Sequence, residues 1–221
     1  MTAIVLEPSL QPGDRAPDFT LPTVDRDGTV SLADYRGKCS VLIGVFRGIY
    51  CPVCRRRIAQ MSLSRDRYQA LGVETLGIVA TKLEHARFYY RFRPTRLPLA
   101  ADPTMIAIRA FKVPKPRVTP EVLQEFQTTH IDPDNELPQP VPATEILVTL
   151  NGRDGYEMNE TDLDDLRQQW SWDAAAQLTG RYLIDRDGVV RWVDIECSTQ
   201  GVAGLGKFTD EEGLQAAMRA L

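Results

Sequence analysis

The chain has 221 residues, which is long enough for one domain with a substantial core. Its formal net charge of −4 gives no reason to expect a nucleic-acid-binding protein. The N-terminus lacks the cationic start and apolar run of a secretory signal, and no stretch has the length and apolar character of a membrane-spanning helix. The sequence therefore predicts a cytoplasmic protein that binds neither membranes nor nucleic acid.

The first half of the chain alternates strand and helix patterns. Asp27-Gly28 lies between two alternating runs and predicts a hairpin near the N-terminus. The apolar run Ser40 to Phe46 predicts a strand that is buried on both faces. Pro52 then opens a helix to about residue 71, with candidate core residues Ile58, Met61, Leu63, Tyr68 and Leu71. Further strands at 73–80 and 97–101, and helices at 82–93 and 102–111, favour parallel β-α-β units.

Residues 113–179 interrupt this alternation. Seven prolines break up the first part, and a helical pattern covers 162–178, where Trp170 and Trp172 are expected to pack in the core. We interpret the stretch as an insertion within a single domain of residues 1–221. The last elements expected are the two strands of a second Asp-Gly hairpin and a closing helix, at 181–185, 189–195 and 209–221.

Cys51 and Cys54 form a C-x-x-C pair where the buried strand leads into its helix. The free N–H groups of a first helical turn carry partial positive charge, which stabilises a thiolate. The three-residue spacing puts both sulfurs on one helix face, so one can form a disulfide with the other or resolve its sulfenic acid. Arg47 and the run Arg55–Arg57 add positive charge, which is expected to lower the pKa of a neighbouring thiol.

The cysteine pair has two interpretations besides redox chemistry. A packed, unreactive thiol pair is one alternative. Half of a zinc site is another, but no second C-x-x-C or C-x-x-H exists, and the isolated Cys39 and Cys197 complete such a site poorly. Cys197 is expected to be a buried bystander rather than a distant resolving thiol. His85 and His130 lie in no motif and are expected to be ordinary surface residues.

The segments FRGIYCPVC and YLIDRDGVVRW are the most specific of several motifs in the chain. The others are GDRAPDFTL, VSLADYRGK, LGVETLGIVA and LAADPTMIAIRAF. Together these segments resemble the peroxiredoxin-like AhpC/TSA group of the thioredoxin-like superfamily, over about residues 12–112 and 180–221. The resemblance implies a thioredoxin-like α/β fold, in which a central mixed β-sheet is flanked by helices and carries an N-terminal hairpin and the inserted segment.

The same resemblance implies a thiol-dependent peroxidase. A cysteine thiolate would attack a hydroperoxide substrate and become a sulfenic acid, a second thiol would condense with it, and a thioredoxin- or glutaredoxin-like reductant would reduce the disulfide. Neither a metal nor a bound organic cofactor is implied, and a homodimer is expected by analogy. The group has a catalytic arginine just before the late strand, near Arg181. The candidate catalytic residues are therefore Cys51, Cys54, Arg47 and Arg181.

The pattern leaves the attacking cysteine and the reaction open. Peroxiredoxins carry P-x-x-x-T-x-x-C around the reactive thiol. If Cys54 is the reactive cysteine, Cys51 occupies the threonine position and Arg47 the proline position. If Cys51 is the reactive cysteine, those positions are occupied by Gly48 and Gly44. A thiol–disulfide oxidoreductase of the thioredoxin type is an alternative, because C-x-x-C resembles that class more closely. A second alternative is a non-catalytic thioredoxin-like binding protein, in which the insertion covers the dithiol or recruits a partner.

Overall fold

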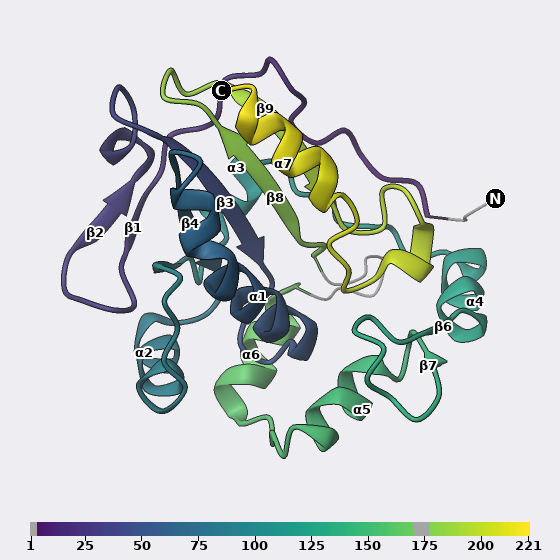
Figure 1. The fold of residues 1–221 in the computed structure, drawn as a ribbon. Helices are drawn as coiled ribbons and strands as arrows, with labels where there is room; N and C mark the ends of the chain where they lie inside the picture. Colours follow the sequence, from purple (N-terminus) through teal and green to yellow (C-terminus); the bar gives the residue numbers. More distant parts are fainter. Residues whose placement is uncertain (1–3, 170–176) are drawn as a thin grey trace.

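The computed structural model describes residues 4–169 and 177–221 (Figure 1). Within these ranges a five-stranded sheet forms the centre of the molecule, in the order β5-β4-β3-β8-β9. Its strands are β3 (Ser40–Phe46), β4 (Val73–Val79), β5 (Leu99–Ala101), β8 (Gly180–Ile184) and β9 (Val190–Ile195). Strands β3, β4 and β5 are parallel, whereas β8 runs antiparallel to β3 and to β9. The predicted mixed sheet, its parallel half and its late hairpin are confirmed.

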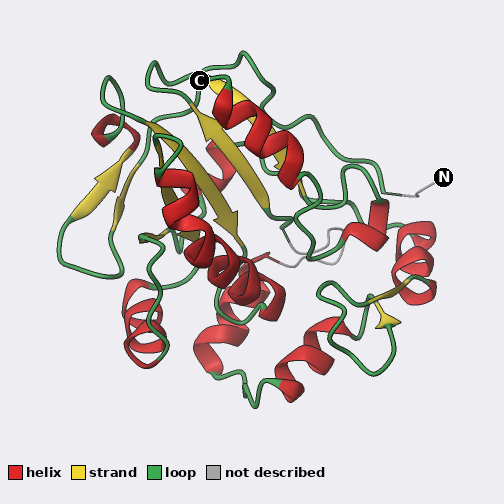
Figure 2. Ribbon diagram, in the orientation of Figure 1, coloured by secondary structure: helices red, strands yellow, loops and turns green. Residues whose placement is uncertain are grey.

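Helices cover both faces of this sheet (Figure 2). The long helix α1 (Pro52–Gln69) packs on β4, and α7 (Glu211–Arg219) packs on β8 and β9; Figure 1 shows both in front of the sheet. The short helix α3 (Ile106–Ala110) lies behind it, and α2 (Leu83–Phe92) lies at one side. The predicted N-terminal hairpin is present as β1 (Thr20–Pro22) and β2 (Thr29–Ser31). Among the described helices, none combines the length and apolar character that a membrane crossing needs.

Helix α1 lies close against the centre of the sheet. Every residue of β3 is buried, as its apolar run predicts. A Cβ at Gly44 in β3 would lie 2.7 Å from the ring of Phe46 and 2.8 Å from the sulfur of Met61 in α1, so the glycine leaves room for these two side chains between the strand and the helix. Leu63 was expected in the core but is 85% exposed, because it lies about 200° around the helix from the buried Met61. This packing fixes the first turn of α1 at the carboxyl end of β3.

The segment that interrupts the β-α alternation lies between α3 and β8. It contains α4 (Pro120–Thr128), β6 (His130–Ile131), β7 (Val141–Pro142), α5 (Ile146–Arg153) and α6 (Glu160–Gln169). These elements follow an arc around the end of the sheet where α1 begins, and α5 contacts α1 (Figure 1). The helix predicted at 162–178 is observed in its first part as α6, but residues 177 and 178 are not helical, and residues 170–176, including Trp170 and Trp172, lie outside the described residues. That this segment is an insertion stays a prediction.

Candidate redox site

Cys51 is the N-cap residue of α1. Its backbone is extended, its sulfur accepts a hydrogen bond from the backbone N–H of Cys54 at 3.2 Å, and Pro52 follows as the first helical residue. The sulfur thus takes the place of the oxygen that usually caps a helix, where the N-terminal dipole favours negative charge. Both cysteines are free thiols, and their side chains are buried, with 2% of Cys51 and 0% of Cys54 exposed.

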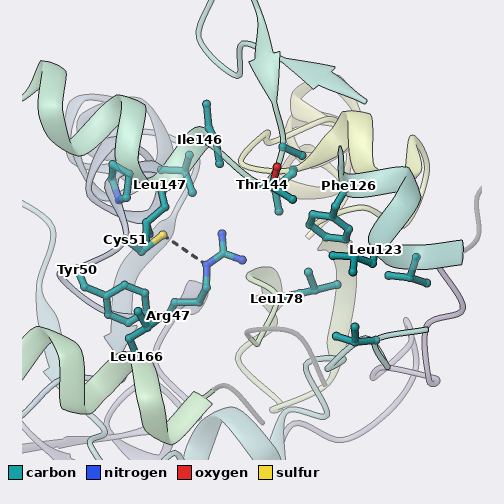
Figure 3. A pocket seen from close by; sticks show the side chains of 16 residues that line it. Arg47, Tyr50, Cys51, Leu123, Phe126, Thr144, Ile146, Leu147, Leu166 and Leu178 are labelled. Atoms are coloured by element: carbon teal, nitrogen blue, oxygen red, sulfur yellow. Dashed lines mark hydrogen bonds between the residues drawn. The ribbon is translucent and has the colours of Figure 1, made fainter. Parts of the chain in front are cut away.

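Arg47, at the end of β3, is the cation that contacts the sulfur of Cys51. Its Nε donates a hydrogen bond to Sγ at 3.4 Å (Figure 3). Its two terminal nitrogens donate to the carboxylate of Glu196 at 2.8 and 2.9 Å, and one also donates to the backbone carbonyl of Gln177 at 3.1 Å. A bidentate pair fixes the guanidinium plane. The pair therefore directs the remaining donor, Nε, at the thiol.

Glu196 directly follows β9 and holds Arg47 from the far side. Its carboxylate also accepts backbone N–H bonds from Thr179 at 3.0 Å and Gly206 at 2.6 Å, so this buried ion pair is well satisfied. Glu196 is not among the site residues expected from the sequence. The one available signal was a carboxylate directly after a predicted buried strand, and nothing in the sequence links that position to Arg47.

The two thiols have opposite electrostatic environments. Burial acts to raise the pKa of Cys51, but a hydrogen bond from the Cys54 thiol, the charge and Nε donor of Arg47 and the backbone N–H of Cys54 outweigh it. The pKa of Cys51 is consequently lowered to about 6. Burial raises the pKa of Cys54, and so does the bond that its thiol donates to Cys51. These environments therefore favour ionisation of Cys51 over ionisation of Cys54.

Contacts from α5 and α6 hold the loop between β3 and α1. The side chain of Gln169 in α6 donates to the Arg47 carbonyl at 2.6 Å and accepts from the Tyr50 hydroxyl at 3.0 Å. Asn151 in α5 donates to the Tyr50 carbonyl at 3.1 Å. The side-chain hydroxyl of Thr81 accepts the N–H of Ile49 at 3.1 Å. The loop that carries Arg47 and Cys51 is thus tied to residues far away in the sequence.

The arginines that follow Cys54 are engaged elsewhere. Arg55 and Arg56 both donate to the carboxylate of Asp154, at 3.0 and 2.6 Å, and Arg57 pairs with Asp134. Their side chains bind the segment between α4 and α6 to the outer surface of α1. Arg47 is consequently the arginine of this cluster that the structure brings to a sulfur.

Arg181, the other predicted catalytic arginine, lies in β8 and is buried among different partners. It donates to Asp194 at 2.9 Å and to Glu211 at 3.1 Å, and its guanidinium lies 3.9 Å from the ring centre of Phe208 and 5.0 Å from that of Trp192. The structure brings Arg47, but not Arg181, into hydrogen-bonding contact with Cys51.

The remaining cysteines and histidines lie outside this constellation. Cys197 is buried, and burial followed by the charge of Glu196 raises its pKa, which agrees with the bystander role predicted for it. Burial likewise raises the pKa of the half-buried Cys39. His130 is exposed as predicted, whereas His85 is largely covered, with Nε2 3.6 Å from Asp162. In the described part of the chain, no group of three or more His, Cys, Asp or Glu residues is placed to hold a metal ion.

A cavity of about 330 Å³ opens directly onto Cys51. Arg47 and Cys51 lie on one side of it, and Leu123 and Phe126 lie across from them (Figure 3). Its lining is Arg47, Tyr50, Cys51, Pro52, Val53, Val118, Val122, Leu123, Phe126, Ala143, Thr144, Ile146, Leu147, Leu166, Leu178 and Leu205. Cys54 does not line the cavity. A small molecule in it can therefore approach the thiolate but not the second thiol.

Known sequences match part of the chain. The model described as the AhpC/TSA family matches residues 12–139. A Mycobacterium tuberculosis protein whose name includes the word peroxiredoxin is 31% identical over 102 residues, which are 46% of this chain and 64% of that protein. Peroxiredoxin 2 of Thermoplasma acidophilum is 42% identical over 66 residues, or 30% of this chain and 32% of the relative. The chain thus spans less than two thirds of the length of these curated relatives.

Solved structures share the fold of this chain. The peroxidoxin BcpB from Mycobacterium tuberculosis superposes with a TM-score of 0.57 at 13% identity, covering 96% of this chain and 98% of that one. At this identity the likeness concerns the fold alone, and it confirms the thioredoxin-like architecture expected from the sequence. Because the family model matches more than half of the residues, the chain belongs to the AhpC/TSA family.

Proposed function

We propose that the protein is a thiol peroxidase in which Cys51 is the attacking thiolate and Cys54 the resolving thiol. The observation that carries this proposal is the hydrogen bond from Nε of Arg47 to Sγ of Cys51, on one side of a cavity whose lining does not include Cys54. A lowered pKa provides the nucleophile at neutral pH, and the cavity provides the path for a small substrate. Membership of the AhpC/TSA family supports a peroxide as that substrate.

In the first step, the thiolate of Cys51 attacks one oxygen of the hydroperoxide. The S–O bond forms as the O–O bond breaks, so the sulfur is oxidised to a sulfenic acid and the peroxide is reduced. The departing alkoxide or hydroxide takes a proton from solvent and leaves as an alcohol or water. Arg47 is placed to stabilise the negative charge that moves from sulfur to the leaving oxygen, since its Nε already points at the sulfur.

In the second step, the sulfur of Cys54 attacks the oxidised sulfur of Cys51. An S–S bond forms, the S–O bond breaks, and the hydroxide leaves as water with the proton of the Cys54 thiol. Sγ of Cys51 already accepts the backbone N–H of Cys54 at 3.2 Å, so the residue that carries the second thiol is in contact with the first sulfur in the reduced state. A thioredoxin- or glutaredoxin-like dithiol then reduces the disulfide by thiol–disulfide exchange and restores the thiolate.

A second candidate function is thiol–disulfide exchange on another protein. The observation that favours it is that the activated thiolate belongs to the first cysteine of the C-x-x-C pair, which caps the helix. In this reaction Cys51 attacks a substrate disulfide and forms a mixed disulfide, which Cys54 then resolves. Because the same two residues serve both reactions, the two candidate functions differ in their substrate and not in their catalytic residues.

Rapid mixing of the reduced protein with hydrogen peroxide tests the proposal. We expect Cys51 to be oxidised much faster than free cysteine, an intramolecular disulfide in the wild type, a dimedone-trappable sulfenic acid in Cys54→Ser, and neither product in Cys51→Ser. Oxidation no faster than that of free cysteine, together with rapid reduction of insulin disulfides, would instead establish the exchange reaction. Slow alkylation of both thiols at neutral pH would favour the non-catalytic binding protein.

A further inference from the structure

We propose that Gln169, the last residue of α6, is a positioning residue for the redox reaction. Its amide holds the loop between β3 and α1 in the form that brings Nε of Arg47 to Sγ of Cys51. Gln169 does not line the cavity beside Cys51, so it acts through the loop and not on the substrate. The inference rests on the proposed function and adds to it a residue from the segment between α3 and β8.

The amide of Gln169 binds the loop at both of its ends. Its Nε2 donates to the Arg47 carbonyl at 2.6 Å, and its Oε1 accepts from the Tyr50 hydroxyl at 3.0 Å. A backbone carbonyl only accepts hydrogen bonds, so the NH₂ side of the amide faces Arg47 and its oxygen faces Tyr50. Gln169 is 1% exposed, so water does not compete for either bond. An amide suits this position because it offers a donor and an acceptor side by side.

The loop needs this support at Arg47 because a glycine follows. A Cβ at Gly48 would lie 2.9 Å from the hydroxyl oxygen of Thr81, so the close contact between the loop and Thr81 requires a residue without a side chain. Glycine leaves the neighbouring peptide groups freer to rotate than other residues do. The bond from Gln169 to the Arg47 carbonyl therefore fixes the peptide group that the glycine leaves free.

Helix α6 presents Gln169 from an inward face that is polar. The buried residues of this helix are spaced three and four positions apart, so they lie on one face: Asp162, Asp165 and Gln169. Asp162 is fully buried and accepts the Tyr156 hydroxyl at 2.7 Å, and Nε2 of His85 in α2 lies 3.6 Å from its carboxylate. Hydrogen bonds are directional, whereas apolar packing is not. These contacts hold the first half of α6 and so place its last residue at the loop.

The contact between Arg47 and Cys51 depends on two supports. Glu196 fixes the guanidinium through two hydrogen bonds. Gln169 fixes the backbone of the loop that carries both the guanidinium and the thiol. The distance of 3.4 Å between Nε and Sγ requires both supports. An opposite charge this close lowers the pKa of an acid by about one to three units, so loss of either support should leave less of Cys51 as thiolate.

The first test is the pH midpoint of alkylation by iodoacetamide, read from the Cys51 peptide, in Gln169→Met. Methionine is unbranched and similar in length, but it cannot donate to the Arg47 carbonyl and accepts only weakly from the Tyr50 hydroxyl. We expect the midpoint to rise by about one pH unit. Gln168→Met is the matched control, because Gln168 is the preceding residue of α6 and is exposed. Its midpoint should stay at the wild-type value.

A double-mutant cycle tests whether Gln169 acts through Arg47. In the Arg47→Met background the cation is absent, so Gln169→Met should then leave the midpoint unchanged. A shift as large as in the wild type would overturn the positioning role. A lower unfolding free energy of Gln169→Met with a wild-type midpoint would also overturn it, because a residue that is only structural gives this result. Should Gln169→Met not fold, Tyr50→Phe/Gln169→Met leaves one buried group unpaired instead of two and should show the same rise.

Alkylation needs no peroxide, so failure of this inference and failure of the proposed function are distinguishable. If the wild type is oxidised rapidly by hydrogen peroxide and Gln169→Met keeps both the midpoint and the rate, the inference is overturned and the peroxidase stands. If the midpoint rises in Gln169→Met but the wild type is oxidised no faster than free cysteine, the peroxidase is overturned and Gln169 remains a positioning residue for thiol–disulfide exchange. We expect the raised midpoint together with oxidation that is about fivefold slower at pH 6, as a shift of one unit implies.

Discussion

Arg47 and Arg181 are both buried in ion pairs, but of these two side chains only Arg47 contacts a thiol. Arg47 gives both terminal nitrogens to Glu196 and directs its Nε at Cys51. Arg181 divides its terminal nitrogens between Asp194 and Glu211, and its guanidinium lies over the ring of Phe208. Both side chains are buried and both are paired. Burial and charge therefore do not distinguish the two arginines. They differ in the direction of Nε, which in Arg47 points at the sulfur of Cys51.

The comparison assigns the two arginines different tasks. Arg47 lies in the loop between β3 and α1 and is held through Glu196 to the end of β9, so its position affects the reactivity of Cys51. Arg181 connects β8 to the start of α7 through Glu211, and its ring contacts are with Phe208 and Trp192. Substitutions at these positions should consequently affect different measurements.

The largest effect is expected for Arg47→Met. Removal of the cation and the Nε donor should raise the pKa of Cys51 above its wild-type value of about 6, because the hydrogen bonds from Cys54 then oppose burial without the help of a charge. The rate of peroxide oxidation at neutral pH should fall by about a hundredfold or more. The double variant Arg47→Met/Glu196→Gln, which leaves no buried carboxylate unpaired, is the check on folding. A double variant that is folded and oxidised at the wild-type rate would contradict the role of Arg47.

The second effect is expected for Arg181→Met. Loss of one partner leaves Asp194 buried beside an apolar side chain, which should cost about 3 kcal/mol in the free energy of unfolding. Denaturant titration measures this loss. In the folded variant, the rate of Cys51 oxidation should stay within about twofold of the wild type, because Arg181 does not contact the thiol. A large loss of rate at unchanged stability would instead make Arg181 catalytic.

A smaller effect is expected for Glu196→Gln, which tests whether Glu196 positions Arg47. An amide accepts only one of the two hydrogen bonds of the guanidinium, so Nε should be less well aimed and oxidation should slow by about tenfold. The pH midpoint of thiol alkylation distinguishes positioning from general destabilisation. A slower rate with an unshifted midpoint and reduced stability would mean that Glu196 is structural only.

The smallest effect is expected for Glu211→Gln. Glu211 accepts bonds from Arg181, Arg67 and the Tyr68 hydroxyl, but a third of its side chain is exposed, so solvent screens these interactions. The loss in unfolding free energy should be about 1 kcal/mol or less. Thermal unfolding measures it, and the thiol chemistry should be unchanged. A loss as large as that of Arg181→Met would show that Glu211, and not Asp194, dominates the pairing of Arg181.

Local sequence patterns were sufficient to predict the junction between β3 and α1. An apolar run, a proline at the first helical position and C-x-x-C are all signals within a few residues of each other, and Arg47 lies four residues before Cys51. The attacking cysteine could not be chosen in this way. That choice depends on which sulfur caps the helix and receives Nε of Arg47, which is a matter of side-chain geometry.

Contacts between distant residues explain what the sequence did not reveal. Glu196 lies 149 positions after Arg47, and no periodicity connects the two. The cavity has the same origin: Leu123 and Leu147 belong to separate short helices in a stretch whose prolines showed only that the regular alternation stops. Leu63 fits the apolar composition of a core helix but is on its outer side, since a single helix does not show which of its faces meets the sheet.

The pH dependence of Cys51 alkylation tests the central claim most directly, measured in the wild type, Arg47→Met and Arg181→Met. Alkylation follows the thiolate, so its rate should rise with pH through a midpoint of about 6 in the wild type and level off above it. Arg181→Met should keep this midpoint, and Arg47→Met should move it to higher pH. A wild-type midpoint near that of free cysteine, or an equal shift in both variants, would contradict the account.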